Sequence, residues 1–203
     1  QKGQKCVLAT ALTENAEVLG GVDILPTDAF EVLADEECLQ LLAQLEEMEI
    51  PVHFMHAGQY FETGRCRFTA LWPVEGTAVP GADANRYPLA LYCDLDGVTL
   101  LSASDMDGTY EHYIAQDADI LKVAHHGSNH STSDVFLQSV TPSVALICAT
   151  GHSETLPSPD LVSRLAKHGV SVYNTGEWGA VTVTCRSGQA TLHTYLPQDR
   201  SVP

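Results

Sequence analysis

Apolar and polar positions alternate in short runs along most of the chain, a pattern typical of half-buried strands. Strands are predicted at 6–10, 51–58, 65–72, 89–95, 98–104, 120–124, 143–149, 170–176, 180–186 and 190–196. Leucines at three-residue steps and a final Met48 predict a helix over 35–49. Shorter helices are predicted at 134–140 and 159–168. Strands and helices alternate without repeats or linkers, so the sequence predicts one mixed α/β domain over residues 1–203.

Turn and cap residues support these boundaries. Asp96-Gly97 separates two apolar runs and predicts a two-residue hairpin. Ser158 is in position to begin a helix, with Pro159 as its first helical residue. Gly169 is suited to end the same helix.

The stretch 119–133, DILKVAHHGSNHSTS, contains the main candidate functional residues of the chain. An apolar strand, interrupted only by Lys122, ends at His125 and His126, and Gly127 lets the backbone turn sharply after them. Adjacent strand residues point to opposite faces, so the two histidines cannot both be core residues. Strand ends of this kind carry the chemistry of many α/β proteins. The alternative is a polar strand end in which the histidine pair has no role.

Composition limits the classes of partner. The net charge is −16, with 26 acidic and 10 basic residues, which repels nucleic-acid phosphates unless a local basic patch or a metal counteracts it. No apolar run approaches the roughly 20 residues that span a bilayer. The six cysteines form no CxxC pair, which excludes a zinc ribbon, and several lie in apolar runs as reduced, buried thiols.

The string LKVAHHGSNHSTSDVFLQSVTPSVALI resembles the C-terminal metallo-β-lactamase-like domain of the competence protein ComEC. The stretches LALYCDLDGVTLLSASD and RLAKHGVSVYNTGEWGAVTV follow in the family's order, and the resemblance covers about residues 6–186. It implies a metallo-β-lactamase-type αββα sandwich with metal ligands at one edge of two packed sheets. The family's opening strands have no counterpart here, so an N-terminally truncated sandwich is expected. An uncovered sheet edge would then favour a homodimer.

The resemblance implies that Asp105 and His125 are metal ligands. It also aligns the family's first ligand motif with residues 13–18, where Asn15 and Glu17 alone keep oxygen atoms. Thr13, Val18 and Leu156 stand where the family has histidines. Because these replacements remove three imidazole nitrogens that a tight zinc site of this type uses, no tightly bound zinc is expected, although a weakly held Zn²⁺, Mn²⁺ or Mg²⁺ is compatible with the set. The weaker ligand candidates are Asn15, Glu17, Asp107, His130 and His152.

Two residues are catalytic candidates. His126 is suited to donate a proton to a leaving group, and Ser128 to donate a hydrogen bond to a phosphate oxygen. The resemblance makes DNA a partner, which the net charge disfavours.

Three hypotheses stay open for the function. The chain is a degenerate ComEC-like domain associated with DNA uptake, an active metal-dependent nuclease or phosphodiesterase, or an interaction module. The family setting implies a soluble piece of a membrane-tethered bacterial parent, without membrane contact of its own. The compartment and the substrate are not indicated.

Overall fold

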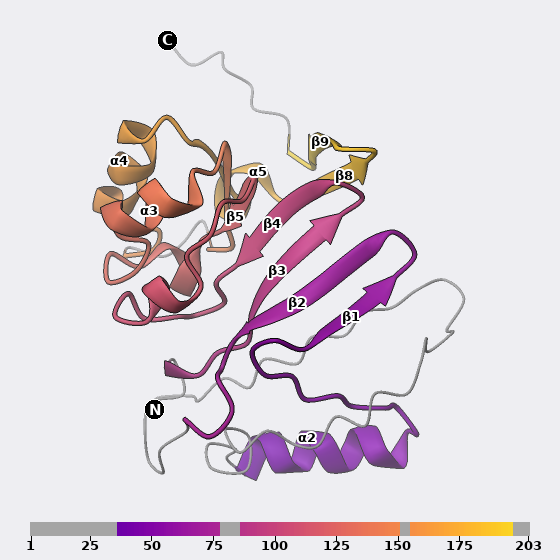
Figure 1. Ribbon diagram of the computed structural model, residues 1–203. Helices are drawn as coiled ribbons and strands as arrows, with labels where there is room; N and C mark the ends of the chain where they lie inside the picture. The colour runs from indigo at the N-terminus through magenta and orange to yellow at the C-terminus, as the bar shows by residue number, and fades with distance from the viewer. Residues whose placement is uncertain (1–35, 78–85, 151–154, 197–203) are drawn as a thin grey trace.

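The computed structural model describes residues 36–77, 86–150 and 155–196 (Figure 1). Within these ranges, seven strands form one sheet in the order β1 to β7, and β8 and β9 form a separate hairpin. The strands are β1 (Tyr60–Thr63), β2 (Cys66–Trp72), β3 (Ala90–Leu95), β4 (Val98–Ser102), β5 (Ile120–Lys122), β6 (Val144–Ile147), β7 (Ser171–Asn174), β8 (Val181–Arg186) and β9 (Gln189–Thr194). The α-helices are α2 (Glu36–Glu47), α3 (Asp134–Val140), α4 (Pro159–Lys167) and α5 (Thr175–Trp178), and the 3₁₀ turns are η2 (Glu111–Tyr113) and η3 (Ala124–Gly127).

The large sheet is antiparallel in one half and parallel in the other. Strands β1 to β4 form an antiparallel meander, and β4 to β7 run parallel to one another. The predicted hairpin is confirmed at Asp96 and Gly97, where both residues have positive φ values of 55° and 88°. This backbone matches the right-handed twist of the flanking strands. The carboxyl ends of the four parallel strands therefore meet at one edge of the sheet.

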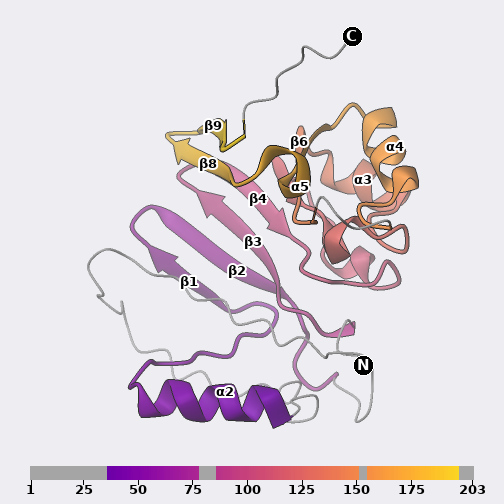
Figure 2. The ribbon, with the colours of Figure 1, turned by 180° about the vertical axis from the view of Figure 1, so that it is seen from behind.

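Helices α3 and α4 cover one face of the parallel half (Figures 1 and 2). Each connects parallel neighbours, and right-handed crossovers place both helices on the same side. The register aligns Leu101, Leu121 and Ala145 in one row, all of them fully buried. Leu137 of α3 and Leu161 of α4 belong to the same apolar core. Helix α2 lies at the other end of the molecule from α4.

The β8–β9 hairpin attaches to the meander through one residue of the β3–β4 turn. Ser187 donates its backbone N–H to the Asp96 carboxylate at 2.8 Å, and Gly188 donates to the Asp96 carbonyl at 2.7 Å. A Cβ on Gly97 would lie 3.2 Å from the Cα of Gly188, so the two turns touch through their backbones.

The predicted mixed α/β class, with a large sheet as its centre, is confirmed, and so are the helices at 35–49, 134–140 and 159–168, each boundary to within two residues. The strand predicted over 51–58 is wrong. Pro51 lacks an N–H, and Gly58 has a φ of 91°, which breaks an extended ladder. The segment instead bonds irregularly to the end of β2, where Ala57 donates to the Pro73 carbonyl. The first strand after residues 51–58 in the sequence is β1.

Strand β1 pairs only with β2 in the described part of the chain. Dimerisation through its outer edge stays a prediction. The predicted strand at 6–10 and the loop at 13–18 lie outside the described residues. Within the ranges that the structure describes, no helix has the length and apolar character needed to cross a membrane.

Candidate functional site

The carboxyl ends of β4, β5 and β6 bring the predicted site residues to one edge of the sheet. Asp105 follows β4, His125 and His126 follow β5, and Cys148 follows β6. The backbone N–H of His125 donates to the Ser104 carbonyl at 3.0 Å, so the aspartate loop and the histidine loop are adjacent.

The histidine loop is strained. His125 has φ and ψ of 47° and 47°, His126 has 55° and 22°, and Gly127 has a φ of 85°. A left-handed conformation costs a non-glycine residue roughly 1–2 kcal/mol. Ser104 and Thr132, in the flanking loops, also have positive φ values. Backbone strain concentrated in this way is typical of functional sites.

Contacts on both sides stabilise this backbone. Ser128 donates its N–H to the His125 carbonyl at 3.0 Å, and Ser158 donates to the Gly127 carbonyl at 2.8 Å. A Cβ on Gly127 would lie 2.7 Å from the Cβ of Pro157, so only glycine fits there. The turn that precedes α4 therefore packs directly against the histidine loop.

Two side chains approach the carboxylate of Asp105. The Nε2 atom of His126 lies 3.5 Å from Oδ2, and the ammonium of Lys122 lies 4.0 Å from Oδ1. Lys122 also donates to the Ser104 carbonyl at 3.1 Å. All three side chains are largely shielded, with exposed fractions of 15% for Asp105, 21% for Lys122 and 33% for His126. Their mutual attraction is accordingly screened less than that of a surface pair.

The orientation of His126 follows from its other ring nitrogen. Nδ1 lies 2.7 Å from the carbonyl oxygen of Cys148, which can only accept a hydrogen bond. Nδ1 therefore carries a proton, and Nε2 is directed at Asp105. A carbonyl on the far nitrogen is the usual support of a histidine that binds a metal or transfers a proton.

The donor set fits one weakly held cation. Asp105 and His126 present an oxygen and a nitrogen to the same space, and a proton or a metal ion between them would be stabilised. Lys122 opposes a metal there, because its fixed positive charge lies beside the same carboxylate. Across the described ranges, no group of three or more His, Cys, Asp or Glu side chains has the arrangement of a metal site. These residues do not fit a two-metal centre, which needs several ligands for each ion.

The loop after the histidines is clamped by two charged side chains. Glu111 of η2 is 2% exposed and accepts the backbone N–H groups of Thr132 and Ser133. Burial raises the pKa of Glu111, although these hydrogen bonds and the nearby Arg164 act against the shift. From α4, Arg164 donates to the carbonyls of Ser131 and Thr132 at 3.3 and 3.0 Å. The Oγ1 of Thr132 is buried without a hydrogen-bond partner.

The other predicted residues occupy the same region with different surroundings. Ser128 is buried, and its hydroxyl accepts the N–H of His130 at 3.3 Å. Asp107 accepts the N–H of Thr109 at 2.9 Å, and the bonds from Thr109 lower the pKa of this carboxyl. The Asp107 and His130 loops touch, since Gly108 donates to the His130 carbonyl at 3.1 Å. Their catalytic and metal-binding roles stay predictions.

Asn15, Glu17 and His152 lie outside the described residues. Sequence reasoning missed the roles of Lys122, Glu111 and Arg164. Lys122 is recognisable in the sequence, since it is the one charged residue that interrupts the apolar run at 120–124. No sequence pattern indicates the roles of Glu111 and Arg164, because charged residues in a short turn and a surface helix are ordinarily exposed.

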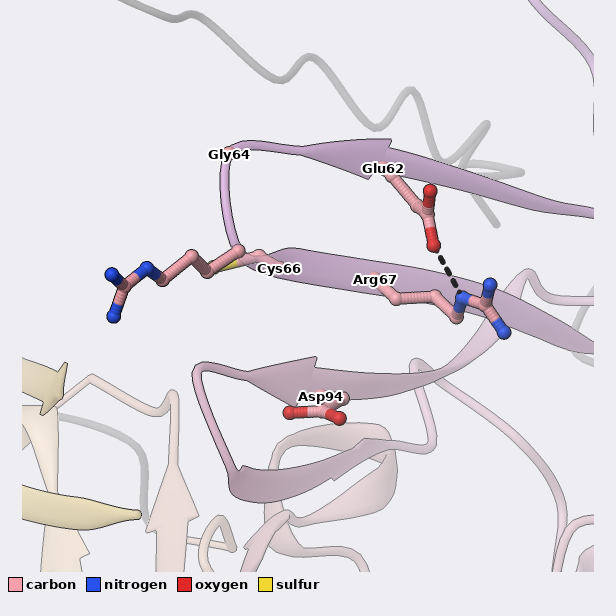
Figure 3. Close-up of a pocket in the computed structure, with 6 residues that line it drawn as sticks. Glu62, Gly64, Cys66, Arg67 and Asp94 are labelled. Atoms are coloured by element: carbon pink, nitrogen blue, oxygen red, sulfur yellow. Dashed lines mark hydrogen bonds and ion pairs between the residues drawn. The ribbon is translucent and has the colours of Figure 1, made fainter. Parts of the chain in front are cut away.

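A concave region lies at the end of the sheet opposite the histidine site. It is an open polar hollow of about 360 Å³, lined by Glu62, Gly64, Arg65, Cys66, Arg67 and Asp94 (Figure 3). Arg67 forms an ion pair with Glu62 at 2.7 Å, and both side chains are more than half exposed. The hollow therefore lacks the enclosure and the converging polar groups of the histidine site.

The described residues form a mixed α/β domain whose candidate site lies on the loops after the parallel strands. No protein-family profile matches the chain. It is similar to ComE operon protein 3 of Bacillus subtilis, with 26% identity over 82% of this chain and 22% of that protein. Competence protein ComA of Neisseria gonorrhoeae is 26% identical over 66% of the chain and 22% of its own length. The resemblance to the ComEC family is thus confirmed.

The protein YcaI of Escherichia coli is 29% identical over 62% of the chain and 17% of its own length. The chain therefore spans about a fifth of the length of these relatives. Two solved structures are also similar. A metal-dependent hydrolase described as putative, from Parabacteroides distasonis, has a TM-score of 0.47 at 14% identity, covering 70% of each chain. The metallo-β-lactamase fold protein YhfI of Bacillus subtilis has a TM-score of 0.40 at 11% identity, covering 75% of this chain and 61% of its own.

Proposed function

We propose that this chain is a ComEC-like domain associated with DNA uptake whose histidine site is catalytically degenerate. The observation that carries the proposal is the surroundings of Asp105, whose carboxylate faces one imidazole and one ammonium. A hydrolytic metal centre generates hydroxide by placing a water on an ion held by three or more ligands. Lys122 provides positive charge at this carboxylate without providing a ligand. Since ComE operon protein 3 and competence protein ComA each align with this chain over only 22% of their own length, we propose that the domain belongs to a longer, membrane-tethered bacterial parent.

A metal-dependent hydrolase is the second candidate, and one observation favours it. His126 is held by the Cys148 carbonyl in the orientation that a metal ligand or a proton donor needs. In that case His126 would transfer the proton to a leaving group, and Asp105 would stabilise the charged imidazole.

Elemental analysis and a nuclease assay distinguish the two candidates. The purified chain is expected to carry well under one equivalent of zinc and to cleave neither single-stranded nor double-stranded DNA with Zn²⁺, Mn²⁺ or Mg²⁺ added. Stoichiometric zinc, or DNA cleavage abolished by His126→Ala or His125→Ala, would establish the hydrolase instead.

Substitution of Lys122 tests the electrostatic argument directly. Lys122→Met keeps the apolar stem and removes the ammonium near Asp105, so affinity for Mn²⁺ or Zn²⁺ is expected to rise roughly tenfold. Lys167→Met is the matched control, because its ammonium is exposed and contacts Asp134 instead. Isothermal titration of both variants measures the effect. Equal affinities in the two variants would contradict the role assigned to Lys122.

A further inference from the structure

Three cysteines gather at the edge of the sheet opposite the histidine site. In the antiparallel register of β2 and β3, Cys66 is paired with Leu95 and Cys93 with Phe68. Residues two apart in a strand share a face, so Cys66 and Cys93 are diagonal neighbours on one face. That face is turned away from α3 and α4, because Tyr92, on the other face, packs against the core that these helices cover.

The β8–β9 hairpin brings the third cysteine to the same place. In β8, Cys185 is half-buried between two exposed neighbours, so its side chain faces the rest of the molecule. Ser187, two residues after Cys185, donates to the Asp96 carboxylate at 2.8 Å. Arg65, the residue before Cys66, forms an ion pair with the same carboxylate at 3.5 Å. The side chain of Asp96 therefore holds the start of β2 and the end of β8 together.

The thiol of Cys66 also interacts electrostatically with both other thiols. Burial, and then the charge of Cys66, raises the pKa of Cys93 to about 12. The same two causes, in the same order, raise the pKa of Cys185. Cys93 is 5% exposed and stays a protonated, inert thiol, whereas Cys66 and Cys185 are both partly accessible. Figure 3 shows Cys66 at the turn end of β2, on the rim of the open hollow.

Among the described residues, these thiols are not part of any group of three or more His, Cys, Asp or Glu side chains arranged to hold a metal ion. We propose that Cys66 and Cys185 form an oxidisable pair that closes a disulfide between β2 and β8 by exchange with a low-molecular-weight disulfide. One protein thiolate attacks the small disulfide, forming a mixed disulfide and releasing one small thiol. The other protein thiolate then attacks the protein sulfur of that bond and releases the second small thiol. Two protein thiols are oxidised, and one small disulfide is reduced to two thiols.

The bond would tie the hairpin to the large sheet covalently. In the reduced protein, polar contacts of the Asp96 turn hold the hairpin in place. A disulfide between residues 66 and 185 closes a loop of about 120 residues and reduces the freedom of the unfolded chain. The oxidised protein is expected to melt roughly 10 °C above the reduced protein.

The experiment uses the full chain, first reduced and then equilibrated with oxidised glutathione at pH 8. Thiol titration is expected to show the loss of two of the six thiols. Non-reducing peptide mapping is expected to identify one crosslink, between the peptides of Cys66 and Cys185. Cys66→Ser and Cys185→Ser each remove the crosslink and the rise in melting temperature. Cys148→Ser is the matched control and keeps both, because its exposed thiol lies at the other edge of the sheet.

Peptide mapping shows which cysteines are crosslinked and so distinguishes the proposed disulfide from the alternatives. A crosslink from Cys66 to Cys93, a stable glutathione adduct on Cys66, or six free thiols after oxidation would each overturn the proposal. So would a crosslink to Cys6 or Cys38 in place of Cys185. The proposal concerns the opposite edge from the histidine site, so its result is independent of the metal and nuclease assays.

Discussion

Glu111→Ala is expected to lower the free energy of unfolding by about 3 kcal/mol at neutral pH. The carboxylate is buried and accepts the backbone N–H groups of Thr132 and Ser133. Alanine leaves both donors without a partner in the protein interior, at roughly 1–3 kcal/mol each, partly offset by relaxation. It also removes a carboxyl group that interacts electrostatically with Arg164. Urea unfolding followed by circular dichroism measures the change.

The pH dependence of this effect has a definite sign. Burial raises the pKa of Glu111 above its ordinary value of 4.5, so between 4.5 and the raised value the folded state binds more protons than the unfolded state. Stability from this group is fully present below pH 4.5 and is lost as the pH rises through the raised pKa. The destabilisation by Glu111→Ala should therefore be larger at pH 4.5 than at pH 7.

Glu46→Ala serves as the control, because Glu46 is exposed on α2 and its loss should change stability by less than about 0.5 kcal/mol at either pH. If Glu111→Ala behaved like Glu46→Ala, the clamp on the histidine loop would be refuted.

Gly127→Ala is expected to cost about 3 kcal/mol and to displace His126. Two effects add. The φ of 85° disfavours any residue with a Cβ, and the new methyl group would lie 2.7 Å from Pro157 and 3.2 Å from Leu161. Because the loop must move away from α4, the contact between His126 and Asp105 should be lost. Thermal unfolding reports the first effect, and the histidine resonances in an NMR spectrum report the second.

Gly169→Ala separates the two contributions. Gly169 has a φ of 74°, and a Cβ there would meet nothing within 4 Å. Its substitution should cost only the conformational part, about 1 kcal/mol, and should leave the His126 resonances unchanged. Equal destabilisation by the two variants would show that the packing of Pro157 against the loop contributes nothing.

The sequence predicted the elements whose signals are local. Asp96-Gly97 has the composition of a two-residue hairpin, and Ser158-Pro159 that of a helix start, so both were identified from a few residues. The segment 51–58 was misassigned because its alternation of side chains is a strand signal, while its hydrogen bonds depend on where β2 ends. Such partners are distant in sequence and leave no periodic pattern.

The candidate site was predictable only in part. The histidine pair stood out because it ends an apolar strand. Which histidine faces Asp105 depends on two left-handed residues and on the carbonyl of Cys148, 22 positions away from His126. The support from Glu111 and Arg164 was equally hidden, since these side chains reach the loop, Glu111 buried and Arg164 half-buried, only when η2 and α4 pack around it.

The order of the strands has a consequence for how the chain assembles. Along the sheet, β1 to β7 follow one another as they do in the sequence. During synthesis, each strand that leaves the ribosome from β2 onwards finds its neighbour already made, and no strand has to wait for a later one. The β8–β9 hairpin comes last and attaches at Asp96, in one of the early turns. Growth of the described sheet is therefore stepwise, and the last step joins Ser187 to Asp96, which lies 91 positions earlier in the chain.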